Sequence, residues 1–264
     1  MIGGIPLFAS GSFNLYSSRL QLPVDEYVAV MGFGTSFGTM SADDSTVLMD
    51  DGNYGNAGEY TYRTTISTGP VTFNQWLYDT STDSDLMGFY YDSLYKYVFN
   101  SDKSGYEVIG SMADGDPYPV DPTFTETGKE VAKVWRVNVA ADLEWYFHPD
   151  TEQAFLDTNP DLAIDATDFV DTFELALAEN WFRAVSGGGD FCSSSTDEIV
   201  GACDFSDGTD PDFANVGLKA VMDDNGDYTI IEFTFVDDHS NWNTRYFLSS
   251  FVMTPVNLEL YNYY

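Results

Sequence analysis

The sequence predicts a mainly β fold, a β-sandwich or barrel with one or two α-helices, in a single domain over residues 1–264. Three observations lead there. Apolar and polar residues alternate over several short segments, as they do in half-buried strands. Aromatic residues make up 16% of the chain, and flat rings suit pleated surfaces. One segment also predicts a hairpin with a well-defined register.

That hairpin covers residues 216–236 and is predicted to turn at Asn225-Gly226. Both residues tolerate the positive φ of a type I′ turn. A two-residue turn places the apolar residues of both strands on one face and a Lys–Glu ion pair on the other, and a slip of one residue would break both matches. The predicted pairs are Val216–Phe235, Leu218–Phe233, Ala220–Ile231 and Lys219–Glu232.

The remaining elements are predicted from periodicity. The clearest helix covers 167–185, where Phe169, Phe173, Leu177 and Trp181 recur at four-residue steps after a cap at Asp165 or Thr167. A second helix is expected over 83–99. Strands are expected over 26–33, 59–67, 71–78, 133–147 and 245–253, with a loop over 111–128. Residues 1–24 and 256–264 are expected to act as arms.

The net charge of the chain gives the strongest indication of the environment in which the protein works. The chain has 43 acidic and 10 basic residues, a formal net charge of -33. Self-repulsion of this size destabilises a compact state unless salt screens it. The carboxylates are spread along the chain between apolar residues, so we expect a folded protein from an extreme halophile. The same charge argues against nucleic acid and against an anionic membrane as direct partners.

The chain shows no clear targeting segment and has two cysteines. No apolar run is long enough for a transmembrane helix. Residues 1–10 have no basic region typical of a signal peptide, and we expect synthesis in the cytoplasm followed by assembly or lysis. The two cysteines, Cys192 and Cys203, lie in a polar stretch and are expected to form a disulfide. Two free thiols and a thiolate metal site are the alternatives.

Catalytic motifs are sparse. Residues 34–38 match the G-x-S-x-G nucleophile elbow around Ser36, and His239 after Asp237 and Asp238 would complete a Ser-Asp-His order. The alternating β and α units of such hydrolases are absent, and a Gly-rich loop leaving a strand explains the match equally. His148 and His239 lack metal-ligand spacing and are expected to be surface residues. A hydrolase using Ser36 or a carboxylate pair stays an alternative.

Two acidic clusters could bind Ca²⁺ or Mg²⁺ through carboxylate oxygens. So acidic a chain forms such clusters without any metal, and the second one lies in the predicted turn. We therefore assign no catalytic residue and no cofactor, and leave metal ligands open. A Ca²⁺- or sugar-binding β module is a further alternative. The clusters are Asp114, Asp116 and Asp121, and Asp223, Asp224 and Asp227.

Some segments resemble virion structural proteins of haloarchaeal viruses. The strands at 60–67 and 71–78 followed by a capped helix from Asp83, and the closing segment 225–242, resemble tail-tube subunits. A single jelly-roll capsid protein fits the same strand pattern. The resemblance implies a structural subunit that self-associates into a homo-oligomeric assembly, together with other virion proteins. It also implies a virion or extracellular location in high salt.

Overall fold

The computed structural model describes residues 19–21, 39–40, 42–61, 66, 68–101, 106–185, 190–193 and 196–264. The chain divides into two units, 1–65 with 101–105, and 66–100 with 106–264. Each unit is described by itself. The expected strand 26–33, Ser36 and nearly all of the expected arm 1–24 lie outside the described residues. No helix in the described ranges is long and apolar enough to cross a membrane.

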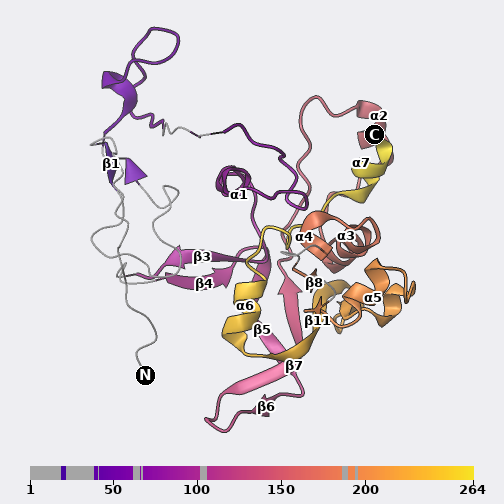
Figure 1. The fold of residues 1–264 in the computed structure, drawn as a ribbon. Coiled ribbons are helices and arrows are strands. Elements are labelled where there is room, and N and C mark those ends of the chain that lie inside the picture. The colour runs from indigo at the N-terminus through magenta and orange to yellow at the C-terminus, as the bar shows by residue number, and fades with distance from the viewer. Residues whose placement is uncertain are drawn as a thin grey trace. The chain divides into compact units, whose positions relative to one another are not determined.

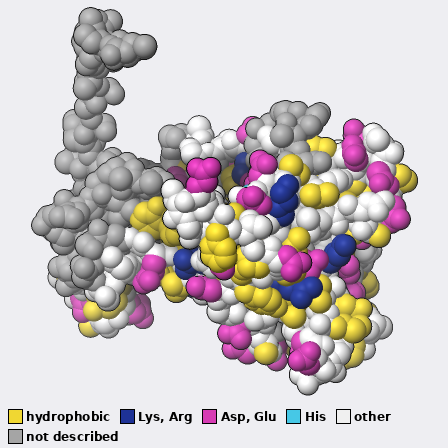
Figure 2. Space-filling view, turned by 90° about the horizontal axis from the view of Figure 1, so that it is seen from below, with side chains coloured by type: hydrophobic (Ala, Val, Ile, Leu, Met, Phe, Trp, Pro, Cys, Tyr) yellow, Lys and Arg dark blue, Asp and Glu magenta, His cyan; other side chains and the backbone are white. Residues whose placement is uncertain are grey.

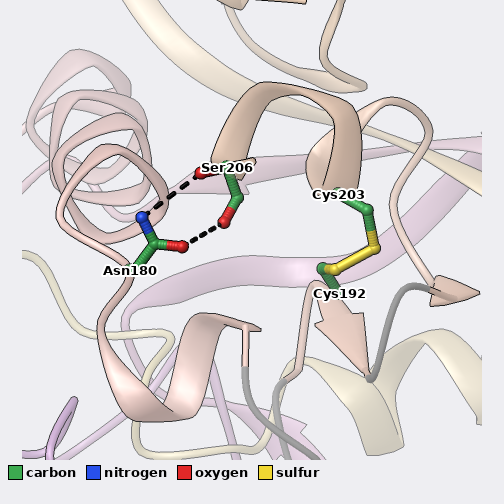
Figure 3. Close-up of a disulfide and its surroundings, with 4 residues drawn as sticks. All are labelled: Asn180, Cys192, Cys203 and Ser206. Carbon is green, nitrogen blue, oxygen red and sulfur yellow. Dashed lines mark hydrogen bonds between the residues drawn. A yellow bond between two sulfur atoms is a disulfide. The ribbon is translucent and has the colours of Figure 1, made fainter. Parts of the chain in front are cut away.

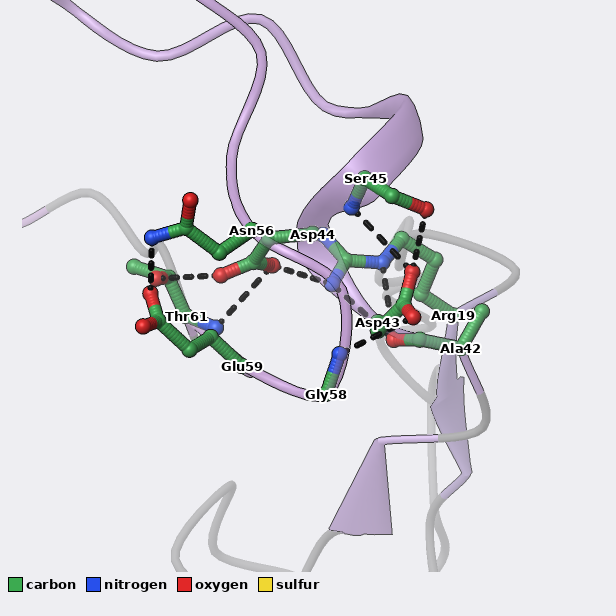
Figure 4. A network of polar contacts seen from close by, with 9 residues as sticks. All are labelled: Arg19, Ala42, Asp43, Asp44, Ser45, Asn56, Gly58, Glu59 and Thr61. Atoms are coloured by element: carbon green, nitrogen blue, oxygen red, sulfur yellow. Dashed lines mark hydrogen bonds and ion pairs between the residues drawn. The ribbon is translucent and has the colours of Figure 1, made fainter.

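The first unit is organised around the buried carboxylate of Asp44. It contains β1 (Leu20–Gln21) paired with β2 (Thr39–Met40), and the 3-10 helix η2 (Asp44–Thr46). Asp44 is fully buried, pairs with Arg19, and accepts hydrogen bonds from the backbone N–H (3.1 Å) and the hydroxyl (2.7 Å) of Thr61. Asp43 caps η2 and accepts from the N–H of Gly58 at 3.0 Å (Figure 4). These bonds join segments around residues 19, 44 and 61.

The second unit is built on one open antiparallel sheet with the strand order β10-β11-β7-β5, and β6 pairs with β7. Its edges are β10 and β5, so the sheet does not close into a barrel, and within the described residues no second sheet packs on it as in a sandwich. The two short hairpins are β3–β4 and β8–β9. The strands are β3 (Tyr95–Phe99), β4 (Tyr106–Gly110), β5 (Ala113–Val120), β6 (Thr123–Phe124), β7 (Glu130–Val139), β8 (Cys192–Ser193), β9 (Thr196–Asp197), β10 (Leu218–Met222) and β11 (Tyr228–His239).

Helices rather than a second sheet bury the core. The helix α3 (Ala166–Ala178) contacts β10 and β11, and α6 (Asn241–Phe247) contacts β4 and β5 (Figure 1). The fold is therefore mixed α/β, and the expected mainly β sandwich or barrel is wrong. The other helices are α1 (Ser81–Met87), α2 (Gln153–Thr158), α4 (Phe182–Val185), α5 (Ala202–Ser206), η3 (Phe213–Asn215) and α7 (Leu258–Tyr263).

The apolar stripe of α3 fills the space between helix and sheet. Phe169, Phe173 and Leu177 are fully buried, and the ring of Phe173 lies 6.2 Å from that of Phe233 on β11. The side chain of Asp165 caps the helix as predicted. The helix is shorter than predicted because Asn180 adopts a left-handed φ of 52°, which ends the helical path before α4.

The hairpin register is confirmed for Leu218–Phe233, Lys219–Glu232 and Ala220–Ile231. Its turn differs from the prediction. Gly226 alone of the central pair has a positive φ, of 93°, and the N–H of Asp223 donates to the carbonyl of Asp227 at 2.8 Å. The loop therefore has three residues and a bulge, the next commonest hairpin geometry.

Two of the side-chain partners predicted within the hairpin differ in the structure. Phe235 forms a bridge with Ile199 rather than with Val216. The carboxylate of Glu232 forms its ion pair with Arg136 on β7, 2.8 Å away, and not with Lys219. Lys219 and Arg136 both lie opposite Glu232, but the guanidinium of Arg136 contacts the carboxylate through two nitrogens, each at 2.8 Å.

Several segments adopt a different structure from the predicted one. The helix expected over 83–99 ends at Met87, and Tyr95 begins a strand. Residues 71–78 form turns, because the carboxylate of Asp83 accepts the N–H of Val71 and the amide oxygen of Asn74 accepts the N–H of Trp76, both at 2.8 Å. The expected loop 111–128 contains β5 and β6. The expected strands 133–147 and 245–253 become β7 and part of α6.

The C-terminal segment is a helix packed on its own unit. The ring of Tyr261 in α7 lies 5.9 Å from that of Trp181, and the ring of Tyr263 lies 5.4 Å from that of Phe155 in α2. The hydroxyl of Tyr263 also donates to Glu152 at 3.0 Å. Residues 256–264 are therefore not the extended arm or strand expected from the sequence.

Candidate functional site

Four aromatic side chains from three elements touch one another at the surface of the second unit. We call Tyr97 of β3, Tyr106 of β4, and Trp242 and Tyr246 of α6 the aromatic surface. The ring of Tyr97 lies 5.5 Å from Tyr106 and 6.3 Å from Tyr246, and that of Tyr106 lies 5.9 Å from Trp242. Tyr246 is 53% exposed and Trp242 is 39% exposed. The rings are in mutual contact while part of their area stays open to water.

The local sequence explains why these rings gather. In α6, Trp242 and Tyr246 are four residues apart and share one side of the helix. Thr244 and Leu248 are buried instead. The hydroxyl of Ser240 caps the helix by accepting the N–H of Asn243. The helix therefore presents the rings of Trp242 and Tyr246 outward, while Phe247 and Leu248 pack in the core.

Two side-chain bonds hold α6 across the neighbouring strands. The amide of Asn241 donates to the carbonyl of Pro117 on β5 at 3.0 Å, and the guanidinium of Arg245 donates to the carbonyl of Val108 on β4 at 2.8 Å. Arg245 also lies 3.5 Å from the carboxylate of Asp116, whose side chain is 67% exposed. These contacts fix the helix, and with it the spacing of the rings.

Acidic groups of β5 act on the buried Tyr95, which lies two residues before Tyr97 on β3. Burial raises the pKa of the Tyr95 hydroxyl, and the carboxylates of Asp116 and Asp114 raise it further, while Arg245 opposes them. Burial also raises the pKa of Tyr97, and the nearby hydroxyls of Tyr246 and Tyr106 add to this shift against a hydrogen bond with Ser249. Figure 2 shows hydrophobic side chains reaching the surface of the protein among acidic and a few basic ones.

The histidines do not assemble a catalytic triad in the described residues. His239 is only 8% exposed, and its Nε2 lies 3.0 Å from Oε1 of Glu198 rather than beside Asp237 or Asp238. The prediction of a surface residue is therefore wrong for His239. His148 is exposed as predicted, and it lies 3.5 Å from the equally exposed Asp150.

The acidic clusters have structural explanations. Within the described ranges, no group of three or more His, Cys, Asp or Glu side chains is arranged to hold a metal ion. The carboxylate of Asp223 closes the hairpin turn by accepting the N–H groups of Asn225 and Asp227, and these bonds lower its pKa. Asp114 and Asp116 lie on β5, where Asp116 is 3.5 Å from Arg245.

The cysteines form the predicted bond. Cys192 on β8 is joined to Cys203 on α5, with Cα atoms 5.2 Å apart. The same short helix is fixed at its other end, where the hydroxyl of Ser206 donates to the side-chain oxygen of Asn180 at 2.7 Å and the amide of Asn180 donates to the carbonyl of Ser206 at 3.2 Å (Figure 3). The disulfide is typical of an oxidising environment.

Sequence reasoning missed the aromatic surface. It joins β3 and β4 to a helix more than a hundred residues later, and no local pattern links these segments. One signal was available in the spacing of Trp242 and Tyr246 behind Ser240, which indicates a capped helix with two rings on one side.

Comparisons with known proteins give only distant likenesses. No family model matches the sequence, and no curated protein matches it. Among solved structures, Listeria monocytogenes OppA bound to peptide shares 14% identity over 74% of this chain, with a TM-score of 0.45. The pheromone receptor PrgZ, described with its mode of peptide binding, shares 14% over 73%, with a TM-score of 0.44. The periplasmic murein tripeptide binding protein MppA shares 14% over 73%, with a TM-score of 0.47.

These matches correct the expected identity. The chain spans about three-tenths of the length of those proteins, from 29% to 30%. All three are described as peptide-binding proteins rather than capsid or tail subunits. No family model or curated protein supports the expected resemblance to haloarchaeal virion proteins, and the open, helix-covered sheet is not the β-sandwich or jelly roll that it implied. That resemblance, the virion location and the homo-oligomeric virion assembly are wrong. So are the alternatives of a hydrolase and of a Ca²⁺- or sugar-binding module. The descriptions of these neighbours name binding, not catalysis.

Proposed function

We propose that this chain is a non-enzymatic binding protein that works outside the cell in high salt and holds a polypeptide ligand on its aromatic surface. The observation that carries the proposal is the contact cluster of Tyr97, Tyr106, Trp242 and Tyr246, which stays partly exposed although its rings pack on each other.

The composition of the surface supports a protein ligand. Tyr, Trp and Arg are the residues most enriched in the parts of interfaces that contribute most to affinity. Here Arg245 lies on the same helix as both α6 rings. Rigid rings lose little conformational entropy on binding, and the bonds of Asn241 and Arg245 fix the helix beforehand. A surface prepared in this way binds without first having to order itself.

The environment is supported by two further observations. The disulfide between Cys192 and Cys203 favours an oxidising compartment. The net charge of -33 requires screening, and it disfavours nucleic acid and anionic lipid as ligands. A polypeptide contacts such a surface through rings and apolar groups, whose burial salt strengthens rather than weakens.

Selection from a random peptide library displayed on phage tests the proposal. The immobilised full chain is screened at high KCl concentration, and recovered peptides are measured against the double variant Trp242→Leu/Tyr246→Leu. We expect recovered peptides to bind the wild type and to lose at least tenfold in affinity on the double variant, since aromatic hot spots cost about 2 kcal/mol or more when truncated.

The matched control is Tyr146→Leu, which removes a ring that is 90% exposed and lies on a loop outside the aromatic surface. It should bind the recovered peptides like the wild type. Recovery of no peptides, or of peptides that bind all three proteins equally, would contradict the proposal. Circular dichroism at the same salt concentration shows whether the double variant is folded, and Trp242→Phe keeps a ring for the case in which it is not.

A further inference from the structure

We infer that the aromatic surface selects polypeptide segments carrying lysine or arginine, whose cationic groups lie against its rings. This inference rests on the proposed function and names the chemistry of the ligand. It follows from the faces that the rings leave open, the sign of the charges beside them, and the state of the one guanidinium within the site.

The rings supply the first attraction. The face of an indole or phenol ring carries partial negative charge and attracts an ammonium or guanidinium group within about 6 Å. Tyr97, Tyr106 and Tyr246 contact their neighbours at tilted or edge-on angles of 61° and 77° rather than stacked face to face. In an edge-on contact the edge of one ring meets only one face of the other. Tyr246 and Trp242 also stay 53% and 39% exposed, so both keep ring area that a cation can contact.

The charges that adjoin the rings add a second attraction. On β5, the exposed carboxylate of Asp116 lies 3.5 Å from Arg245, and the exposed carboxylates of Asp116 and Asp114 both act on the hydroxyl of Tyr95. Lys96 and Glu107 alternate with Tyr97 and Tyr106 along β3 and β4 and so point to the other side of that hairpin. The charged groups that we place beside the surface are therefore the two carboxylates of β5 and the guanidinium of α6.

That guanidinium is already engaged. Arg245 donates to the carbonyl of Val108 and faces Asp116 at 3.5 Å, and its Nε is buried. An incoming carboxylate would have to displace these contacts and approach Asp114 as well. A cation meets the carboxylate of Asp114, which has no ion-pair partner among the described residues, and the exposed parts of Trp242 and Tyr246. The surface therefore favours basic over acidic segments.

High salt makes this mode of recognition suitable. The Debye length is about 3 Å at 1 M, so attraction between separated charges is lost. A cation in van der Waals contact with a ring leaves no room for salt ions between the two groups, so this attraction is screened far less. The preference for Lys and Arg should therefore persist at molar KCl, where non-specific attraction to an acidic protein has disappeared.

The experiment analyses peptides from the same phage selection. We expect Lys and Arg to be more frequent in peptides that need the aromatic surface than in the unselected library. Replacing the contact Lys of such a peptide with norleucine should weaken binding by roughly 2- to 30-fold at molar KCl. The variant Asp114→Asn should weaken binding of the Lys peptide but not of its norleucine analogue, and Asp150→Asn, on a distant loop, should change neither.

The outcomes separate the two proposals. Peptides that require Trp242 and Tyr246 without an excess of Lys or Arg, or norleucine analogues that bind equally well, would overturn the inference and leave the proposed function standing. Recovery of no peptide that requires the aromatic surface would overturn both. A Lys preference that vanishes at molar KCl would show long-range attraction to an acidic protein and would also reject the inference.

Discussion

The imidazole of His239 is stacked on the ring of Phe235, with centroids 3.9 Å apart, and its Nε2 meets Oε1 of Glu198 at 3.0 Å. Its Nδ1 is buried without a hydrogen-bond partner. The residue directly precedes Ser240, the cap of α6. The buried, neutral imidazole of His239 therefore packs beside the N-terminal end of α6, the helix that carries Trp242 and Tyr246.

The stability of the second unit should fall on acidification because of this histidine. Burial lowers the pKa of His239 below its ordinary value of 6.5, against the opposing attraction of Glu198 and Asp237. The unfolded chain then binds a proton more readily than the folded one, so stability present above pH 6.5 is lost as the pH falls. Thermal melts between pH 7.5 and about 5.5 should show that the difference in melting temperature between the wild type and His239→Gln becomes smaller as the pH falls.

His148→Gln is the control, because His148 is exposed and its substitution removes a histidine without disturbing a buried environment. It should track the wild type at every pH. A gap between the wild type and His239→Gln that stays constant with pH would show that the buried imidazole does not titrate on unfolding.

Asp168 should have the opposite effect on the pH dependence of stability. It lies in the first turn of α3, where burial, with added repulsion from Asp165, Glu259 and Asp171, raises its pKa to about 6. Because the pKa of Asp168 is higher in the folded chain than in the unfolded one, its contribution to stability is complete below pH 3.8 and is lost as the pH rises through about 6. Asp168→Asn should therefore raise the melting temperature at pH 7 and have little effect near pH 4.

The asparagine oxygen can still accept the N–H of Asp165, so the substitution keeps the capping contact. The matched control is Asp142→Asn, an exposed site in the loop after β7. Its effect at pH 7 should be smaller than that of Asp168→Asn. Equal effects at both positions would point to general charge reduction rather than to the buried carboxylate.

The comparison of sequence and structure shows where local rules are sufficient. The stripe and cap of α3 and the pairing of Leu218 with Phe233 follow from periodicity and capping, and both are present. The prolines Pro117 and Pro119 suggested a loop, yet β5 accommodates them because it is an edge strand with an irregular register. Its neighbour β7 supplies the pairing that the sequence of β5 alone does not reveal.

The site could not be predicted for a related reason. Residues 245–253 have a composition that also suits a strand, and the choice of helix depends on Thr244 and Leu248 being buried, which the sequence does not show. Once α6 is a helix, packing brings Tyr246 to Tyr97, and neither residue carries a local signal of this contact. Contacts between segments that are far apart in the sequence therefore determine both the helix and the aromatic surface.

Removing the disulfide should destabilise the second unit without abolishing its fold. The bond joins residues 11 apart in sequence, and a loop of that size gives about 2–3 kcal/mol in the chain-entropy account. In the double variant Cys192→Ser/Cys203→Ser, the bonds between Asn180 and Ser206 still hold α5. Denaturant unfolding at high salt measures the loss, and alkylation of the native wild type without reductant should label neither thiol. Unchanged stability would contradict this account.

Folding of the whole chain should depend on salt. The net charge of -33 produces repulsion that screening relieves, and the Debye length shortens from about 10 Å at 0.1 M to about 3 Å at 1 M. Circular dichroism during a KCl titration should show unfolding, or loss of cooperativity, well below about 1 M. Full thermal stability in dilute buffer would show that the acidic surface needs no screening and would reject the halophile interpretation.

Deleting α7 should destabilise the unit rather than change its association. The ring of Tyr261 covers Trp181, which is only 8% exposed, and the ring of Tyr263 packs on the buried Phe155. Removing residues 258–264 exposes both partners at a cost of roughly 1–3 kcal/mol. Denaturant unfolding should give a lower midpoint, and the fluorescence of Trp181 should shift towards that of an indole in water.

Tyr264→Ala is the control for this truncation, because Tyr264 is 75% exposed and contacts only the adjacent Tyr263 among the ring pairs of the described residues. Its unfolding midpoint should match that of the full chain. Light scattering at high salt should give the same particle size for all three proteins. A truncated chain with the midpoint of the full one would show that α7 does not stabilise the unit, and that Trp181 stays covered by other residues.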